Sequence, residues 1–473
     1  MMRKVGTKKE VRREHRTERG LTGRLYGWAD NPPSCLEGDS GEDRGMSVVE
    51  TDIGTIAPDW KVVPLKDVAE KPQYGLTAKA AKSGDTQFLR ITDITDQGVN
   101  WATVPFCSAP KKKIDTCRLK SGDIVFARIG ATTGKSYMIT DPPDAVFASY
   151  LIRVRAGEDL DPGFLIQFFQ SRGYWQQVDA NKHANLKKGV NGSILSELLL
   201  PLPPLPEQKK IAHILSTVQR AIEAQERIIQ TTTELKKALM HKLFTKGLRN
   251  EPQKQTEIGP VPESWSPVTL GELCGKPNGA LQTGPFGSQL HKHEYQEDGI
   301  AVVNPTHLAG NRINHENVPR VSEKVAQRLG KHRLRKFDIL FARRGEIGRQ
   351  GLVTEAEETW LCGTGCFLVR ASKPFIDNRF LALYFATDRL VKWLYSHAAG
   401  VIMPNLNNSV MQRLPVFYPD MESQITIIET FTAIDQKLSA AARRQTALQD
   451  LFRTLVHELM TAKTRVHELE LSL

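Results

Sequence analysis

The chain has 473 residues, of which 40% are hydrophobic and 25% charged, and its formal net charge is +11. A chain of this length can bury substantial cores and is expected to hold two or more domains. It contains neither a long apolar run nor an apolar centre near its N-terminus, so the sequence predicts no membrane span and no secretory signal, and we expect a cytoplasmic protein. The positive charge favours a polyanionic partner, and nucleic acid is the commonest one.

The first 50 residues are dense in Arg and Lys and then rich in Gly, Pro, Asp and Ser. They show almost no aliphatic periodicity, which predicts a disordered basic N-terminal extension over residues 1–50. Such a segment is either a basic arm for nucleic acid or a stretch upstream of the true start, because Met46 directly precedes the first residues that resemble a domain.

Two similar globular units follow. Turn residues 53–59 precede Trp60 in the first, and turn residues 258–264 precede Trp265 in the second. Short β-like segments and then an aromatic-rich helical segment come next in each, which predicts an α+β globule of about 150 residues made twice. The β-like segments are residues 88–94, 124–128, 150–155, 301–304, 339–343 and 367–370, and the helical segments are residues 162–178 and 377–397.

A long helix is predicted after each globule. Residues 203–247 open with prolines and then run without Gly or Pro until Gly247, with apolar residues at helical spacing. The prolines and Glu207 suit the start of a helix, and Lys246 with Gly247 suits its end. At 1.5 Å per residue this helix would be roughly 60 Å long, more than a compact domain needs for a core helix.

The same stretch occurs twice, because a shift of 216 positions lays Gln208 on Gln424 and Thr245 on Thr461 without a gap. An internal repeat this long indicates two copies of one domain-plus-helix unit, whose helices we expect to pair as an antiparallel coiled coil. The residues expected in the shared seam are Ile211, Val218, Ile222, Phe431, Ile434 and Leu438, and those expected to face outward are Ile214, Ile228 and Leu448.

Residues 122–136 superficially resemble a nucleotide-binding P-loop. However, Gly130 and Gly134 enclose three residues where that loop needs four, and a β-like run follows where phosphate binding needs a helix. The second copy, residues 337–349, keeps the strand and the glycines but lacks the Lys-Ser pair. We therefore predict a strand that ends in a Gly-rich basic hairpin able to approach a phosphate or a base edge. A nucleotide-dependent nuclease that uses this loop is the enzymatic alternative.

Other basic or amide-bearing loops occur at comparable places in both copies. Residues 74–77 are expected to correspond to residues 286–289, and loops at residues 187–191 and 404–408 precede the two long helices. Arg, Lys, Asn and Gln are the side chains that read base edges in the major groove. The candidate DNA-binding residues are Tyr74, Thr77, Lys79, Arg128, Lys135, Lys187, Lys188, Asn191, Ser288, Gln289, His291, Lys292, His293, Tyr295, Arg343, Arg344, Arg349, Asn405 and Asn407.

The sequence predicts no catalytic residues, no cofactor site and no metal site. No methyltransferase, nuclease, helicase or hydrolase motif stands out. Six cysteines in so long a chain indicate reduced thiols. Cys362 and Cys366 lack a second ligand pair at zinc spacing and are expected to be small core residues, and His291 and His293 lack a third ligand.

Together these features resemble the specificity subunits of type I restriction-modification systems over residues 51–463. The marks that carry the resemblance are the Pro-rich stretch 200–208 ahead of the long helix, the strand from Gly122 with Arg128 and Gly130, the loop 283–288, and the duplication. Residues 415–423 depart from the Pro-rich junction, which leaves the start of the second helix open.

The resemblance implies target-recognition domains at residues 51–202 and 248–420, a central helix at 203–247, and a second conserved helix with a tail at 421–473. Each domain would read one half of a bipartite site in double-stranded DNA. Two modification subunits, which supply S-adenosylmethionine chemistry, would dock on the chain, and restriction subunits that translocate and cut DNA would join them. The chain itself would be non-catalytic. A structural coiled-coil adaptor without DNA specificity is the other alternative.

Overall fold

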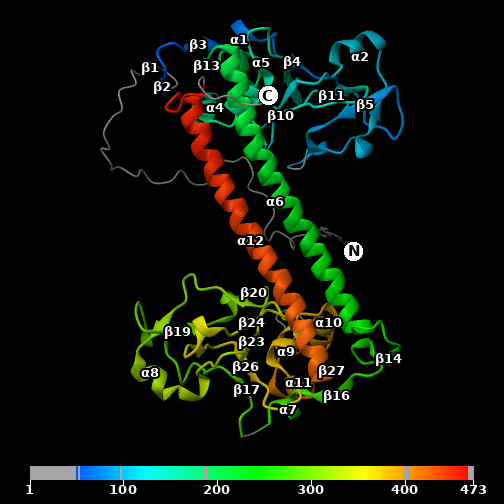
Figure 1. Cartoon of the computed structure of the whole chain (residues 1–473), viewed down its shortest axis with the longest axis vertical. Helices are drawn as coiled ribbons and strands as arrows, with labels where there is room; N and C mark the ends of the chain where they lie inside the picture. The colour runs from blue at the N-terminus through cyan, green and yellow to red at the C-terminus, as the bar shows by residue number, and fades with distance from the viewer. Residues whose placement is uncertain are drawn as a thin grey trace, which may run out of the picture. The chain divides into compact units, whose positions relative to one another are not determined.

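The computed structural model describes residues 49–51, 54–95, 98–130, 132–184, 190–275, 277–398 and 405–466 (Figure 1). The N-terminal extension expected over residues 1–50 lies outside this part of the chain up to residue 48. The chain forms two compact units, the first from residues 1–225 with 444–473 and the second from residues 226–443. Both units mix helices and strands, so the α+β class is confirmed.

The first unit is built on an antiparallel sheet in the order β10 (Ser136–Met138), β9 (Ile124–Ala127), β12 (Leu151–Val154) and β4 (Gln73–Tyr74). A second sheet has the order β11 (Ala145–Phe147), β5 (Thr86–Leu89) and β8 (Phe106–Cys107), with β11 parallel to β5. Two-stranded ladders join β1 (Val49–Thr51) to β2 (Gly54–Ile56), β3 (Lys61–Pro64) to β13 (Leu199–Leu202), and β6 (Ile94–Thr95) to β7 (Gly98–Val99). The helices of this globule are α1 (Leu65–Val68), α2 (Lys111–Cys117), α3 (Pro162–Phe168), α4 (Arg172–Ala184) and α5 (Gly192–Ser196).

The second unit repeats this topology. Its main sheet has the order β17 (Ala280–Thr283), β26 (Cys366–Arg370), β23 (Ile339–Ala342) and β24 (Gln350–Leu352). Its second sheet has the order β18 (Tyr295–Gln296), β22 (Arg320–Val321), β19 (Ile300–Val303) and β25 (Leu361–Cys362). The ladders are β14 (Gln253–Thr256) with β15 (Gly259–Pro262), β16 (Ser266–Thr269) with β27 (Pro415–Tyr418), and β20 (Leu308–Ala309) with β21 (Arg312–Ile313). The helices are α7 (Leu270–Leu273), α8 (Glu323–Arg328), α9 (Asn378–Phe385), α10 (Asp388–His397) and α11 (Asn408–Arg413).

The apolar strand β9 is buried along its whole length because it separates two cores. Ile124 and Phe126 belong to the core that also contains residues of the long helices, whereas Val125 belongs to the core around the second sheet. Strand β23 divides its alternate residues between two cores in the same way. Successive side chains of a strand point to opposite faces, so a strand covered on both faces reads as a continuous apolar run.

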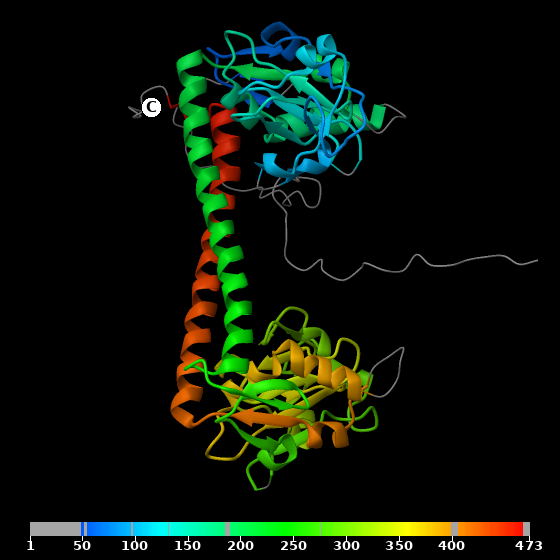
Figure 2. The same ribbon diagram turned by 90° about the vertical axis from the view of Figure 1, so that its right-hand side faces the viewer.

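The two predicted long helices are present as α6 (Leu205–Lys246) and α12 (Met421–Met460). Helix α6 ends where Gly247 adopts a positive φ of 65°, as its C-terminal sequence predicts. Both helices reach each unit (Figure 2) and contribute to one core in each. In the second unit the Lys236 ammonium donates to Asp435 over 2.6 Å. The residues shared in this way are Ile211, Leu215, Val456 and Leu459 in the first unit and Leu243, Phe244, Ile427 and Phe431 in the second.

A buried glutamine at the start of each long helix confirms the repeat in atomic detail. The Gln208 amide donates to the carbonyls of Pro203 and Asp159, and its oxygen accepts from the Asp161 amide. Gln424 makes the same three contacts with Pro419, Phe375 and Asp377. Every partner number in the second set is 216 larger, so the departure in the sequence at residues 415–423 does not alter the junction.

Two details differ from the sequence-based expectations. Each aromatic-rich segment forms two helices, because Ser171 and Thr387 end one helix and begin the next with their backbone and hydroxyl groups. Ile214 was expected to face outward and instead packs, half-buried, against the core of the first unit. Ile228 is 37% exposed, in agreement with its expected outward position.

Candidate nucleic-acid interface

The segment that superficially resembles a P-loop is the predicted hairpin. The Ala127 amide donates to the Lys135 carbonyl over 2.9 Å, and the chain continues into β10, not into a helix. In the second unit the Ala342 amide donates to the Arg349 carbonyl over 2.8 Å. Gly130 and Gly345 have φ values of 88° and 82°, which the tight turns require. This geometry offers no helix N-terminus for a nucleotide phosphate, so the nuclease alternative loses its support.

In the first unit three of the candidate DNA-binding residues come together. The Arg128 guanidinium lies 5.0 Å from the centre of the Tyr74 ring, in a cation–π contact. The Gly192 amide donates to the Tyr74 hydroxyl over 3.0 Å, and Asn191 caps α5 by accepting from the Ile194 amide over 2.8 Å. Tyr74 remains 43% exposed. The strand β4, the end of β9 and the loop before α5 thus form one surface.

The remaining candidates of the first unit lie around this surface or outside the described residues. Thr77 and Lys79 are exposed in the segment after β4, and Lys135 is half-buried in the hairpin. Lys187 and Lys188 fall outside the described residues.

Sequence reasoning missed helix α2 as part of this surface. Lys113 and Thr116 of α2 line a hollow of about 310 Å³ together with Thr77. Residues 111–113 are three successive exposed lysines, a signal that is visible in the sequence but that no motif linked to the loop at residue 77. Lysine ammonium groups at such a place suit the phosphate backbone of DNA.

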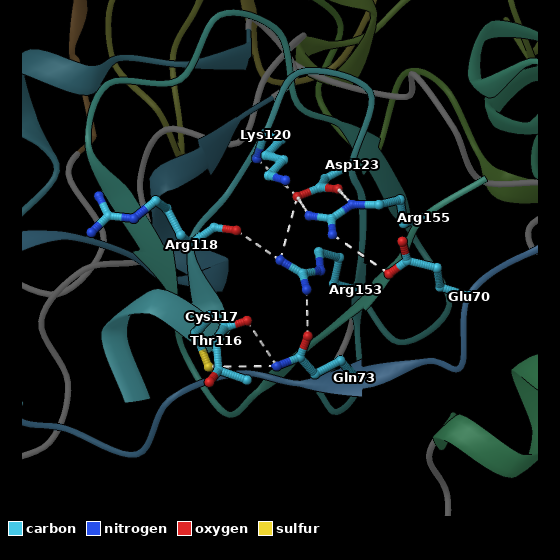
Figure 3. A network of polar contacts seen from close by, with 9 residues as sticks. All are labelled: Glu70, Gln73, Thr116, Cys117, Arg118, Lys120, Asp123, Arg153 and Arg155. Atoms are coloured by element: carbon cyan, nitrogen blue, oxygen red, sulfur yellow. Dashed lines mark hydrogen bonds and ion pairs between the residues drawn. The ribbon is translucent and has the colours of Figure 1, made fainter. Parts of the chain in front are cut away.

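A buried polar network lies beneath the surface of the first unit (Figure 3). The Asp123 carboxylate, 1% exposed, accepts from the Arg155 guanidinium over 2.7 and 3.0 Å, and the Arg153 guanidinium lies 3.5 Å away. Arg153 also donates to the side-chain oxygen of Gln73 on β4, and the Gln73 amide donates to the Thr116 carbonyl over 3.0 Å. The network therefore fixes strand β4 and helix α2, which carry Tyr74 and Lys113, to the central sheet.

The second unit assembles the corresponding residues. The Arg343 Nε donates to the Leu406 carbonyl over 3.1 Å, and the backbones of Arg344 and Asn405 form a β-bridge. Asn407 caps α11 by accepting from the Val410 amide over 2.9 Å, as Asn191 caps α5. The hairpin of this unit thus lies beside the loop that precedes α11.

Not every arginine of this hairpin is free for a ligand. Arg349 forms an ion pair with Glu346 within its own hairpin, at 2.7 Å, so part of its charge is neutralised locally. Arg343 is half-buried and holds the loop before α11, which makes it partly a positioning residue.

The expected correspondence between residues 74–77 and 286–289 is wrong by three residues. Tyr74 pairs with Ile152, and Thr283 pairs with the equivalent Phe367. A Cβ atom on Gly75 would meet the carbonyls of residues 147 and 148, and one on Gly284 would meet those of residues 362 and 363. Gly284, not Gly287, therefore matches Gly75, because only a glycine allows this close backbone approach. Residues 286–293 consequently form an extension of the second unit beyond the equivalent turn.

This extension holds five of the eleven candidates of the second unit, and Tyr295 follows directly after it. Arg328 of α8 anchors this extension, because it donates to the Glu294 carboxylate over 2.6 Å and to the Gln289 carbonyl over 3.0 Å. The rings of His291 and His293 stack with their centres 5.4 Å apart. Ser288, His291, Lys292 and His293 are exposed, whereas Gln289 and Tyr295 are half-buried.

Within the described residues, no three His, Cys, Asp or Glu side chains are grouped so that they could hold a metal ion. Cys362 and Cys366 are core residues, as expected, and burial raises the pKa of both thiols. No helix in the described part of the chain combines the length and the apolar character needed to cross a membrane.

The fold defines a class of chains in which an α+β domain followed by a long helix occurs twice. Comparisons with known proteins identify the family. The model of the type I restriction modification DNA specificity domain matches residues 58–233 and again residues 262–449. These two matches cover most of the chain and coincide with its two copies, so the chain belongs to this family.

Individual relatives agree with this assignment. The putative type I restriction enzyme MjaX specificity subunit of Methanocaldococcus jannaschii is 26% identical over 88% of this chain and 96% of its own length. The type I restriction enzyme EcoBI specificity subunit of Escherichia coli is 24% identical over 63% of this chain and 66% of its own length. The solved S subunit of a type I restriction-modification system from M. genitalium shares the fold, with a TM-score of 0.53 at 17% identity over 85% of this chain and 96% of that one. The function is therefore that of a type I DNA specificity subunit, which is a non-catalytic role.

Proposed function

We propose that each unit reads one half of a bipartite site in double-stranded DNA through its hairpin and the loops beside it. The observation that carries this proposal is the repeated juxtaposition of an arginine at the end of the central strand with an asparagine-capped helix. Arg128 lies beside Asn191 in the first unit, and Arg343 lies beside Asn407 in the second. The target-recognition domains are residues 51–202 and 248–420.

Different side chains provide the affinity for DNA and the choice of sequence. Exposed lysines such as Lys79 and Lys113 supply salt-dependent attraction to phosphates. Amide and guanidinium groups on the loops choose base edges. The loops of the two units differ in sequence and in length, so the two half-sites are unrelated in sequence.

Helices α6 and α12 pair as an antiparallel coiled coil and dock two modification subunits, which restriction subunits then join. The cores that both helices share in each unit, and the ion pair between Lys236 and Asp435, support this pairing. The exposed Ile228, Leu235 and Leu451 offer apolar side chains to partner helices.

The test replaces the extension of the second unit, residues 286–293, with the shorter turn of the first. Methylation-site mapping in cells that carry the complete system is expected to show an altered preference in one half-site and an unchanged other half. A matched control changes Arg128 and Thr77 in the first unit, which should alter the opposite half. Simultaneous changes in both halves for either variant would contradict the proposal.

A further inference from the structure

The first unit contains a hollow of about 250 Å³ where the start of α4 meets the C-terminal end of α12. Its apolar wall includes Ile56, Phe168, Pro201, Val456 and Met460, and its polar rim includes Arg172, His457, Thr461 and Lys463. Gly173, the second residue of α4, also lines the hollow. All of these residues belong to one compact unit.

The second unit fills the equivalent space with one of its own side chains. Arg389 is the equivalent of Gly173 under the shift of 216. The same shift aligns Trp175 with Val391, and the structure supports it because Trp175 contacts the hairpin glycine Gly134 and Val391 contacts the equivalent Gly348. The Arg389 guanidinium donates to the carbonyls of Phe244 and Pro260. Phe244 is the equivalent of Met460, and Pro260 is that of Thr55, next to Ile56. The hollow of the first unit thus lies where glycine takes the place of a half-buried arginine.

The charge at the rim also differs between the units. Arg172, His457 and Lys463 of the first unit correspond to Asp388, His241 and Gly247 of the second. No carboxylate lines the hollow among the residues that the structure describes. The Lys463 ammonium lies 3.2 Å from the His457 Nε2, and burial, followed by Lys463 and Arg172, lowers the pKa of His457. An anion at this rim would relieve the repulsion among these groups.

We infer that this hollow is a docking site for a segment of a partner protein that presents an apolar side chain next to a carboxylate. The apolar side chain enters the space that Arg389 fills in the other unit, and the carboxylate lies against Arg172 and Lys463. Enclosed apolar pockets with a charged rim are the places where interface residues contribute most to binding. Since the second unit is closed by Arg389, such a partner docks at one place on each chain.

No hairpin residue lines this hollow, and the inference does not rest on the proposed reading of DNA. The experiment is a selection of random twelve-residue peptides displayed on phage against the purified full-length chain. Gly173→Arg is the matched variant, because it copies the residue that the other repeat holds in the same environment. Lys463→Glu is a second variant with an exposed substitution at the rim, which preserves the core if the first variant folds poorly.

The expected result is a set of enriched peptides with an aromatic or aliphatic residue beside Asp or Glu. Such a peptide should bind Gly173→Arg and Lys463→Glu at least about tenfold more weakly than the unchanged chain. It should also raise the pKa of His457 in a histidine NMR titration. Binding of DNA by both variants should stay unchanged, which separates this inference from the proposed function.

Three outcomes would overturn the inference. The enriched peptides could lack acidic residues, or they could bind Gly173→Arg as tightly as the unchanged chain. Alternatively, peptides could bind only after removal of residues 467–473, which would make the chain's own last residues the occupant.

Discussion

The two units hold a buried aspartate at the same place beneath the proposed DNA surface, but they surround it differently. Asp123 accepts from Arg155, and Asp338 accepts from the equivalent Arg370. In each, the carboxylate also accepts from a backbone amide three residues earlier. The first unit adds Arg153, whereas the second has the fully buried Leu368 at that position. The duplication therefore preserves the pair that fixes the central strand and varies the residue that points toward the reading loops.

The presence of Arg153 in one unit and Leu368 in the other changes the side-chain contacts that anchor β4 and its equivalent β17. Gln73 and Gln282 both donate to the carbonyl at the end of the neighbouring helical segment, that of Thr116 or Lys331. In the first unit the oxygen of Gln73 also accepts from Arg153. Leu368 cannot offer such a donor, so the Gln282 side chain lacks the second support that Gln73 has. The backbone pairing differs in the opposite direction, because β17 pairs with β26 over four residues whereas β4 pairs with β12 over two.

The largest expected effect comes from removing the two aspartates. Asp338→Ala leaves Arg370 without its partner and should cost roughly 3–5 kcal/mol of stability, because a buried charge loses its counter-ion. Asp123→Ala leaves both Arg153 and Arg155, so its cost should lie at or above the top of that range. Hydrogen exchange measured by mass spectrometry on peptides from each unit checks this order.

A rescue variant sharpens the same comparison. Adding Arg153→Leu to Asp123→Ala copies the second unit and removes one of the two orphaned charges, so it should recover part of the lost stability. Failure to recover any of it would show that Arg153 does not contribute to the cost.

The next effect is a pH dependence that the fully buried His332 adds to the second unit. His332 is 2% exposed, neither ring nitrogen has a hydrogen-bond partner in the described residues, and burial lowers its pKa from 6.5 to about 4. The pKa of His332 is lower in the folded chain than in the unfolded chain, so its neutral form favours folding. The contribution of neutral His332 to the free energy of unfolding is fully present above about pH 6.5 and is lost as the pH falls toward 4. The loss amounts to about 3 kcal/mol.

The matched variant is His332→Cys, because the equivalent residue of the first unit is Cys117. It should remove the contribution of His332, so the acid sensitivity of the second unit should fall to what His307, whose pKa burial also lowers, still contributes. The first unit should be unchanged. Protection against hydrogen exchange in each unit, measured at pH 7 and at pH 4.5, provides the readout. An acid sensitivity that is undiminished in the variant would assign the effect to other groups.

Where the two units are alike, equal effects are expected. Gln208→Ala and Gln424→Ala each leave two carbonyls and one amide without a side-chain partner, at a cost of about 1–3 kcal/mol. The two values should agree within about 0.5 kcal/mol, since every contact is repeated. Unequal losses, measured by exchange in the respective units, would show that the junctions differ in ways their geometry does not reveal.

The sequence was sufficient for features that depend on local pattern or on the repeat itself. Helix α6 begins and ends within a few residues of the expected positions, because the prolines and Gly247 mark its ends. The hairpin at Gly130 followed from the glycine spacing and from the β-like run after it. The duplication separated the hairpin from a P-loop, since a phosphate-binding function would require the same residues in both copies or a helix after the loop.

Features that depend on contacts between distant segments were missed. Nothing local indicates that Gln208 bonds to Asp159, or that Arg153 is buried, because a charged residue in a strand usually faces water. Gly284 is identified as the equivalent of Gly75 only by its close approach to residues 362 and 363. The sequence similarity at Phe286 had suggested Gly287 instead. The hollow at Gly173 becomes visible only when its neighbours are compared with those of Arg389.

The smallest expected effect concerns the lysines of α2. Their counterpart α8 has Glu323 paired with Arg333 and Arg328 paired with Glu294, so two of its three charged side chains are engaged within the unit. Lys113 instead lines the hollow beside Thr77. If it contacts a DNA phosphate, Lys113→Ala should reduce the slope of log affinity against log salt by about 0.9 and weaken binding uniformly across sequences.

The control is Lys336→Ala in the second unit, which should leave the slope unchanged because its ammonium is already paired with Glu355. Both slopes are measured by titrating the assembled complex with its cognate DNA and with an unrelated duplex at several salt concentrations. Equal slopes for the two variants would contradict a phosphate contact by α2. A change for Lys113→Ala on the cognate duplex alone would instead make Lys113 a base-reading residue, because phosphate contacts carry no direct sequence information.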